Sequence, residues 1–255
     1  MDIISLLGIL LAIASIYFGA PDISLNPKTY LELDSFIFVF VGSLSAMLIS
    51  SSFNDTKQLL KLMFLGIIGK QNKSPQKTVD IMLKLCDEAI KTSKQNLPNL
   101  AKQYKNKFLK EATNMVASGL DEPFIIQTLD NTMNETEKRH DIMINKIKSI
   151  GTYASMFGMT GTILGVIQVL KDVKDIENIV SGLSLALLTT LYGLLLSSIV
   201  YLPMSKKLRQ KSDHELLEKY IIREGIKLII NNVIPIKAKF YLTAYIEQKN
   251  KNNAK

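Results

Sequence analysis

Two stretches of sequence decide the fold: IGTYASMFGMTGTILGVIQVL at residues 150–170 and IVSGLSLALLTTLYGLLLSSIVYL at residues 179–202. Neither contains a charged residue or a histidine, and each is long enough to cross the roughly 30 Å hydrocarbon core of a bilayer as a helix. Both carry small and hydroxyl residues at helical spacing, whereas a helix that only contacts lipid favours Leu, Ile and Val on every face. We therefore predict two membrane-spanning helices whose striped faces meet another helix closely or line a polar path.

Two further apolar stretches, residues 3–20 and 36–53, bring the expected number of spans to four. The first carries Asp2 where a signal peptide would have basic residues, so we interpret it as a retained span. The short connections, residues 21–35 and 171–178, hold three basic and six acidic residues, and the other 28 of the 31 Lys and Arg lie elsewhere. The positive-inside rule then places both termini in the cytoplasm.

The sequence therefore predicts an all-α, polytopic membrane protein with four transmembrane helices and a helical cytoplasmic domain. The expected segments are transmembrane helices 1 and 2 with the external loop 21–35 (residues 1–53), the cytoplasmic domain (54–149), transmembrane helices 3 and 4 (150–203) and an amphipathic cytoplasmic tail (204–255).

Local signals mark the helices of the cytoplasmic domain. Ser74-Pro75 is a helix start, and Ser118-Gly119 is a helix end after a helical stretch at about residues 99–117. A helix that starts near Asp121 could run unbroken into the third span.

Composition excludes several classes of protein. The basic residues that give the net charge of +8 lie in the predicted cytoplasmic segments, some directly after the last span. This position favours contact with lipid headgroups over binding of nucleic acid. Cys86 is the only cysteine and falls in a helical apolar pattern, so we expect a buried structural thiol and no disulfide. His140 and His214 lie in charged surroundings typical of solvated side chains, and no catalytic or metal-binding motif is present. We do not expect an enzyme.

The two striped helices offer hydroxyls but no charge. A proton relay cannot be built without ionisable groups, so an ion path would need a carboxylate from a partner helix or a chain of hydroxyls and water. Threonine oxygens at Thr162, Thr189 and Thr190 are hard ligands that suit Na⁺. The same pattern also fits plain packing, because threonines often bond back to their own helix and spaced glycines allow close contact. Both interpretations stay open, and they are compatible.

The amino-acid sequence of the two striped segments resembles that of a known family. The motifs GMTGTILG at residues 158–165 and ALLTTLYG at residues 186–193, followed by Pro203, are similar to the MotA/PomA flagellar stator subunits and to the wider MotA/TolQ/ExbB ion-channel group. Further matches are FLK at residues 108–110 and EKRH at residues 137–140. The likeness covers most of the chain and is densest over residues 150–205.

This resemblance implies a motor component of the bacterial cytoplasmic (inner) membrane without a cofactor. Five copies would surround two copies of a MotB/PomB-like single-span partner that supplies a membrane aspartate and a wall-binding domain, and a flagellar rotor protein would be driven from the cytoplasmic side. Na⁺ is favoured over H⁺, since the threonines stand where sodium-type members carry them. The ion-path and partner-facing candidates are Gly158, Gly161, Thr162, Gly165, Ala186, Thr189, Thr190, Tyr192 and Gly193.

The chain departs from the family pattern at two places. Ala154-Ser155 replaces the usual Ala-Pro, which makes Ser155, with Pro203, a candidate for conformational change. Ile90 and Pro98 stand where the family has a rotor-facing Arg and Glu, so Lys91 and Lys94 become the rotor-contact candidates. The alternatives are a TolQ/ExbB-like energiser of envelope machinery, which normally has three spans, and a non-conducting membrane scaffold.

Overall fold

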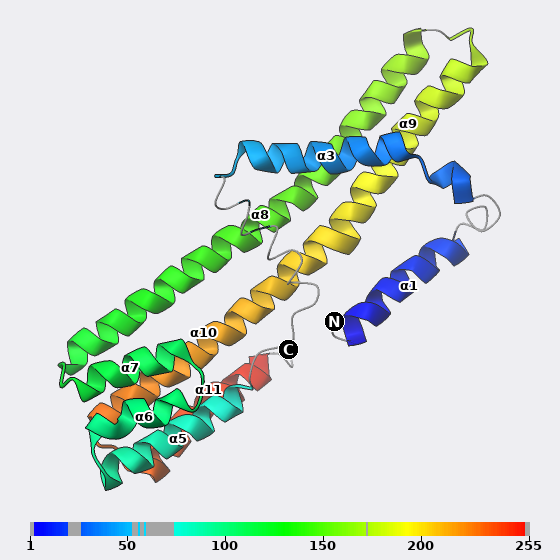
Figure 1. Ribbon diagram of the computed structural model, residues 1–255. Helices are drawn as coiled ribbons and strands as arrows, with labels where there is room; N and C mark the ends of the chain where they lie inside the picture. The colour runs from blue at the N-terminus through cyan, green and yellow to red at the C-terminus, as the bar shows by residue number, and fades with distance from the viewer. Residues whose placement is uncertain are drawn as a thin grey trace. The chain divides into compact units, whose positions relative to one another are not determined.

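The computed structural model describes residues 3–19, 27–52, 74–171 and 173–252, together with Thr56 and Leu59. Every regular element in these ranges is helical (Figure 1), which confirms the predicted all-α class. Most of residues 53–73, the expected start of the cytoplasmic domain, lie outside the described residues. The chain divides into two compact units: a first unit of Met1–Lys70 with Asp141–Arg209, and a second unit of Gln71–His140 with Gln210–Lys255.

The described part of the first unit contains four apolar helical segments. They are α1 (Ile3–Gly19), α3 (Leu33–Ile49), the second half of α8 (Glu122–Lys171) and α9 (Ile176–Leu195), with a short 3₁₀ turn, η1 (Pro27–Tyr30), before α3. Figure 1 shows α3 lying across α9, and the ring of Phe157 on α8 fills the space beside Gly42 of α3. The α8 helix is continuous over 50 residues, as the sequence allowed.

The bounds of α3 differ from the predicted span of residues 36–53. The helix starts three residues early because Glu32 is extended and Asp34 lies in the first turn, where a negative charge is favourable. It ends four residues early, since serines follow Ile49 and the Ser50 hydroxyl donates to the carbonyl of Met47 at 2.9 Å. Such local bonds compete with continuation of a helix.

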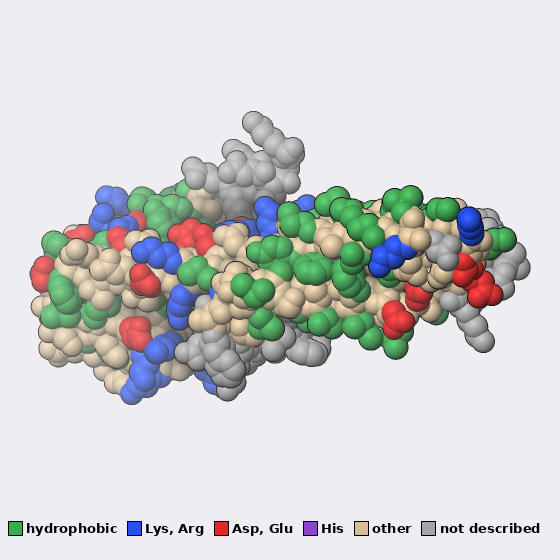
Figure 2. Space-filling view, turned by 90° about the horizontal axis from the view of Figure 1, so that it is seen from above, with side chains coloured by type: hydrophobic (Ala, Val, Ile, Leu, Met, Phe, Trp, Pro, Cys, Tyr) green, Lys and Arg blue, Asp and Glu red, His purple; other side chains and the backbone are tan. Residues whose placement is uncertain are grey.

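Two helical runs of the described chain are long and apolar enough to cross a membrane, Glu122–Lys171 and Ile176–Ile230. The helices α1 and α3 have 17 residues each, which gives about 25 Å of rise against a core of about 30 Å. The predicted count of four spans therefore stays a prediction. On the face drawn in Figure 2, the right-hand part of the molecule shows hydrophobic side chains interleaved with uncharged atoms, and charged side chains gather toward its end.

The fourth predicted span continues into the tail without a break. A wide π-helical turn, η3 (Leu196–Tyr201), joins α9 to α10 (Leu202–Ile230). Pro203 stands just inside α10, and a proline in a regular helix lacks an N–H and clashes with the carbonyl four residues earlier. The extra residue of a π turn relieves this clash, so the helix passes Pro203.

The second unit is a bundle of amphipathic helices. It comprises α5 (Pro75–Lys91), η2 (Lys94–Asn96), α6 (Leu97–Lys102), α7 (Lys107–Ala117), the start of α8, most of α10 and α11 (Pro235–Asn252). Met82, Leu109, Ile125 and Ile221 lie fully inside its core. In this unit α8 and α10 run antiparallel, since Lys219 bonds Thr136, Arg223 bonds Asp130, and Asn231 bonds Glu122.

Three local predictions for this unit are confirmed. Ser74 is the extended N-cap of α5, with Pro75 in the first turn. Gly119 takes a positive φ of 73° after α7, and the Leu120 N–H reaches back to the Met115 carbonyl at 3.4 Å. Cys86 is 1% exposed, and burial raises the pKa of its thiol to about 11, so the thiol is inert.

Two other predictions are wrong. The stretch at residues 99–117 is two helices rather than one: Lys105 takes a φ of 48°, and the Asn106 side chain then caps α7 by accepting from the Leu109 N–H at 3.1 Å. His140 is not the fully solvated side chain expected, because it is half-buried with its Nδ1 atom 2.9 Å from the Ser212 hydroxyl.

Candidate ion path between α8 and α9

Glycines bring α8 and α9 into close contact at two levels. A Cβ atom added at Gly193 would lie 2.6 Å from the Ala154 carbonyl oxygen and 3.0 Å from Gly158 Cα. A side chain at Gly165 would overlap the carbonyl oxygen of Gly182. No L-residue with a Cβ fits at these distances, so the glycines set how closely the two backbones approach.

A cluster of four oxygen atoms lies between these two levels. The hydroxyls of Thr162 on α8 and Thr190 on α9 are 2.5 Å apart. Each also contacts a carbonyl of each helix: Thr162 lies 3.2 Å from Gly158 O and 3.4 Å from Ala186 O, and Thr190 lies 3.3 Å and 3.0 Å from the same atoms. Two hydroxyls and two carbonyls from two helices thus converge.

Thr189 has a different role. Its side chain is fully buried, and its hydroxyl donates to its own helix, 2.7 Å from Leu185 O and 3.2 Å from Ala186 O. It fills the space in front of Gly161, where a side chain would overlap the Thr189 hydroxyl. The Thr189 hydroxyl therefore bonds only its own helix, as the packing interpretation describes. Thr162 and Thr190 also bond their own helices, but their hydroxyls additionally meet across the interface.

The remaining candidates differ in their surroundings. Ala186 is 3% exposed, faces Gly165 and supplies one carbonyl of the cluster. Tyr192 turns toward the start of α3, where its hydroxyl bonds the backbone of Tyr30 and Glu32. Ser155 is half-buried in α8, which runs through it unbroken, and Pro203 is exposed in the first turn of α10.

The two candidate rotor contacts are both engaged within the second unit. Lys91 is exposed and pairs with Asp87 one turn earlier, and the hydrogen bond to Asp87 raises the pKa of its ammonium. Lys94 is half-buried and donates to the carbonyl of Ile230 at 2.9 Å. Because α10 ends at Ile230, Lys94 satisfies a terminal carbonyl of that helix.

The chemistry of the cluster follows from its atoms. Hydroxyl and carbonyl oxygens are neutral, hard ligands that replace the hydration shell of an alkali cation. The hydroxyls of Thr162 and Thr190 make five oxygen–oxygen contacts but have only two protons to donate. Some oxygen lone pairs in the cluster are therefore left without a hydrogen-bond donor. Both side chains are half-buried, which leaves one side of the cluster accessible to a partner. The sequence predicted the hydroxyls, but the carbonyls of Gly158 and Ala186 carry no signal in it.

A side chain added at the contact between Gly165 and Gly182 is expected to destabilise the α8–α9 hairpin. Gly165→Ala places a methyl group against the Gly182 carbonyl and should lower stability by about 1–3 kcal/mol, or roughly 5 °C in melting temperature in detergent. Gly8→Ala in α1 is the matched control, since nothing lies within 4 Å of the added atom. Equal melting temperatures for the two variants would contradict the close approach.

Comparison with known proteins gives a consistent answer. Residues 100–220 match the model of the MotA/TolQ/ExbB proton channel family. The uncharacterized protein YtxD of Bacillus subtilis (strain 168) is 30% identical over 199 residues, which cover 78% of this chain and 73% of that protein. The chemotaxis protein PomA of Vibrio alginolyticus is 25% identical over 97% of this chain and 96% of its own length. The structure of C. jejuni MotAB shares the fold, with a TM-score of 0.87 at 23% identity over 96% of each chain.

The relatives define the class as ion-channel components rather than enzymes. A helical hairpin long and apolar enough to cross a membrane, with close glycine contacts and an interhelical oxygen cluster, fits that class. The chain belongs to the MotA/TolQ/ExbB proton channel family. The resemblance seen at residues 158–165 and 186–193 is thereby confirmed.

Proposed function

We propose that this chain is a flagellar motor stator subunit that forms, with a MotB-like partner, an ion-conducting complex converting a transmembrane ion gradient into torque. The observation that carries the proposal is the Thr162–Thr190 oxygen cluster within an interface that has no charge of its own. Support comes from relatives named Motility protein A and chemotaxis protein PomA.

A partner has to supply the charge. Residues 150–170 and 179–202 contain no ionisable side chain except the phenols of Tyr153, Tyr192 and Tyr201. A cation that leaves water needs compensation inside the bilayer, and an aspartate on a partner helix provides it. A solved structure with the same fold is the flagellar MotAB stator complex from Bacillus subtilis, which supports a MotB-like partner. In this proposal the partner is a single-span MotB/PomB-like protein, and this chain forms a homo-pentamer around it.

Na⁺ is the favoured ion in this proposal. Proton transfer works through titratable groups or a water chain, and neutral oxygens from both helices suit partial dehydration of Na⁺ instead. The cluster holds four such oxygens, and a partner carboxylate would add at least one more.

The proposed topology has four spans in the cytoplasmic (inner) membrane, with both termini in the cytoplasm and basic residues near the lipid headgroups. The second unit then meets the flagellar rotor. Lys91 stays exposed and is the better candidate of the two lysines for that contact, since Lys94 is held at the end of α10.

A TolQ/ExbB-like energiser is the second candidate function, because the family model covers both groups. The helix α1 distinguishes them, since a three-span protein would have no span there. Labelling of single cysteines introduced at residues 22–30 by a membrane-impermeant reagent outside the cell supports the stator topology, and protection of all of them supports the energiser. A scaffold would conduct no ions.

The direct test is reconstitution of this chain with its single-span partner in vesicles. We expect ion flux only when both proteins are present, and we expect flux to fall when K⁺ replaces Na⁺ at constant pH. Flux by this chain alone, or none with the partner, would refute the proposal. Flux that follows pH and ignores Na⁺ would refute the choice of ion only.

A further inference from the structure

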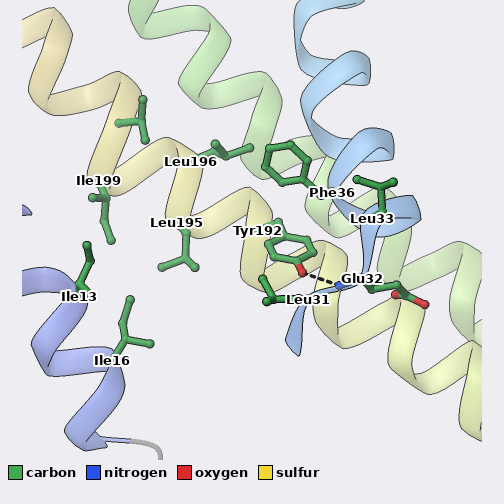
Figure 3. A pocket seen from close by; sticks show the side chains of 11 residues that line it. Ile13, Ile16, Leu31, Glu32, Leu33, Phe36, Tyr192, Leu195, Leu196 and Ile199 are labelled. Carbon is green, nitrogen blue, oxygen red and sulfur yellow. Dashed lines mark hydrogen bonds between the residues drawn. The ribbon is translucent and has the colours of Figure 1, made fainter. Parts of the chain in front are cut away.

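The Tyr192 hydroxyl makes two hydrogen bonds that join α9 to the start of α3. Its hydroxyl donates to the Tyr30 carbonyl at 2.5 Å and accepts from the Glu32 N–H at 3.0 Å. Its ring also meets Phe36 edge to face, with centroids 5.7 Å apart. Figure 3 shows the hydroxyl directed at the Glu32 backbone. We call these contacts the Tyr192 anchor.

The anchor stands on the same turn of α9 as the two features that define the candidate ion path. Thr190, two residues earlier, reaches Thr162 across the interface, and Gly193, one residue later, packs on Gly158 and Ala154. Rotation of α9 about its axis would move the Thr190 hydroxyl away from Thr162. The same rotation would break both bonds of Tyr192, because they point to backbone atoms outside α9.

Glu32 is the one polar side chain, apart from Tyr192 itself, among the described residues that line the space beside Tyr192. The ring lines an open cavity of about 520 Å³ whose walls are almost entirely carbon, with Ile13 and Ile16 of α1 facing Leu195 and Ile199 (Figure 3). The ring has room to swing into this cavity, but its hydroxyl would then lose both bonds among apolar side chains. An unsatisfied buried hydroxyl is unfavourable, so the anchored position is strongly preferred.

We propose that Tyr192 is a positioning residue for the ion path: it fixes the rotation of α9 so that the Thr190 hydroxyl faces Thr162. This inference rests on the proposed function for its effect on ions, but its geometry stands independently. Tyr192→Phe keeps the ring and removes only the hydroxyl. The phenyl ring has no hydroxyl to leave unpaired in the apolar cavity, so the anchored position loses its advantage and α9 gains freedom to rotate.

The first test does not depend on conduction. In a Thr190→Cys variant we measure the rate of thiol modification by a small maleimide, with Cys86 silent because it is buried. Adding Tyr192→Phe is expected to raise that rate by about fivefold or more, since a loss of orientation exposes the half-buried position. Adding Tyr153→Phe is the matched control, because the structure gives no hydrogen bond for this hydroxyl among the described residues. An equal rate in all three proteins would overturn the proposal.

The second test uses the reconstituted complex with its partner. Tyr192→Phe is expected to raise the Na⁺ concentration for half-maximal flux by about fivefold, with a smaller change in maximal flux and nearly the same melting temperature. A merely structural role predicts a loss of maximal flux and of melting temperature with unchanged half-saturation, and that outcome would overturn the proposal. If the wild-type complex conducts no ion, the proposed function fails while the labelling result still decides the role of Tyr192.

Discussion

Thr190→Val is expected to lower Na⁺ flux through the reconstituted complex by at least about tenfold, equivalent to the loss of one interaction of about 1.4 kcal/mol. Valine keeps the shape of threonine and removes the hydroxyl that contacts Thr162 at 2.5 Å and the Ala186 carbonyl at 3.0 Å. The Gly158 and Ala186 carbonyls then lose a donor, and a passing cation loses a ligand. The measurement is Na⁺ uptake into vesicles under an imposed membrane potential.

Thr189→Val is the matched control for this prediction. Its hydroxyl bonds within α9 to Leu185 and Ala186 carbonyls and is fully buried, so flux should change by less than about twofold, in line with the small net value of such a bond. Thr190→Ser, which keeps a hydroxyl, should recover most of the flux. If the valine variants at both positions conduct alike, the cluster has no role in conduction.

Arg223→Met is expected to destabilise the second unit by about 3–5 kcal/mol, or roughly 10 °C in melting temperature. Arg223 of α10 binds Asp130 of α8 through two parallel bonds of 3.0 Å and 2.9 Å and also pairs with Glu224. Glu224 is 3% exposed, and its remaining described partner is the Tyr241 hydroxyl at 3.0 Å. Removal of the guanidinium therefore leaves a buried carboxylate without a counter-charge.

Arg209→Met provides the comparison on the same two helices. Arg209 pairs with Asp141 of α8, but both side chains are about two-fifths exposed, so the cost should stay below about 1 kcal/mol. Adding Glu224→Gln to Arg223→Met should restore part of the lost stability by removing the buried charge. Similar melting temperatures for the two methionine variants would contradict the account, and so would a double variant no better than Arg223→Met.

Local signals predicted the parts of the fold that depend on local chemistry. Ser74-Pro75 and Gly119 mark helix ends because a cap needs only its own turn, and Cys86 is buried because its helix has one apolar face. Asn106 is also a good N-cap residue, but it lies in a polar stretch where an unbroken helix was equally compatible. The burial of His140 depends on Ser212, which lies far away in the sequence, so no local pattern predicts it.

The candidate site shows the same division. Its residue types and its lack of charge could be read at residues 158–165 and 186–193, but three neighbouring hydroxyls could not be told apart by spacing. The structure separates them, since Thr189 bonds only its own helix whereas Thr190 also reaches across to Thr162. Tyr192 was grouped with the ion-path residues, and it contacts the start of α3 instead.

The sequence by itself determined that this protein is helical, that two of its helices suit a membrane, and that one face of each carries small and hydroxyl residues, because helical periodicity assigns every residue to a face. Only the tertiary structure decided which of those residues meet. The glycine contacts fix the axial register of α8 against α9, and the Tyr192 anchor joins α9 to the start of α3. The register of two helices depends on contacts between side chains of both helices, so the pattern of either helix alone leaves it open.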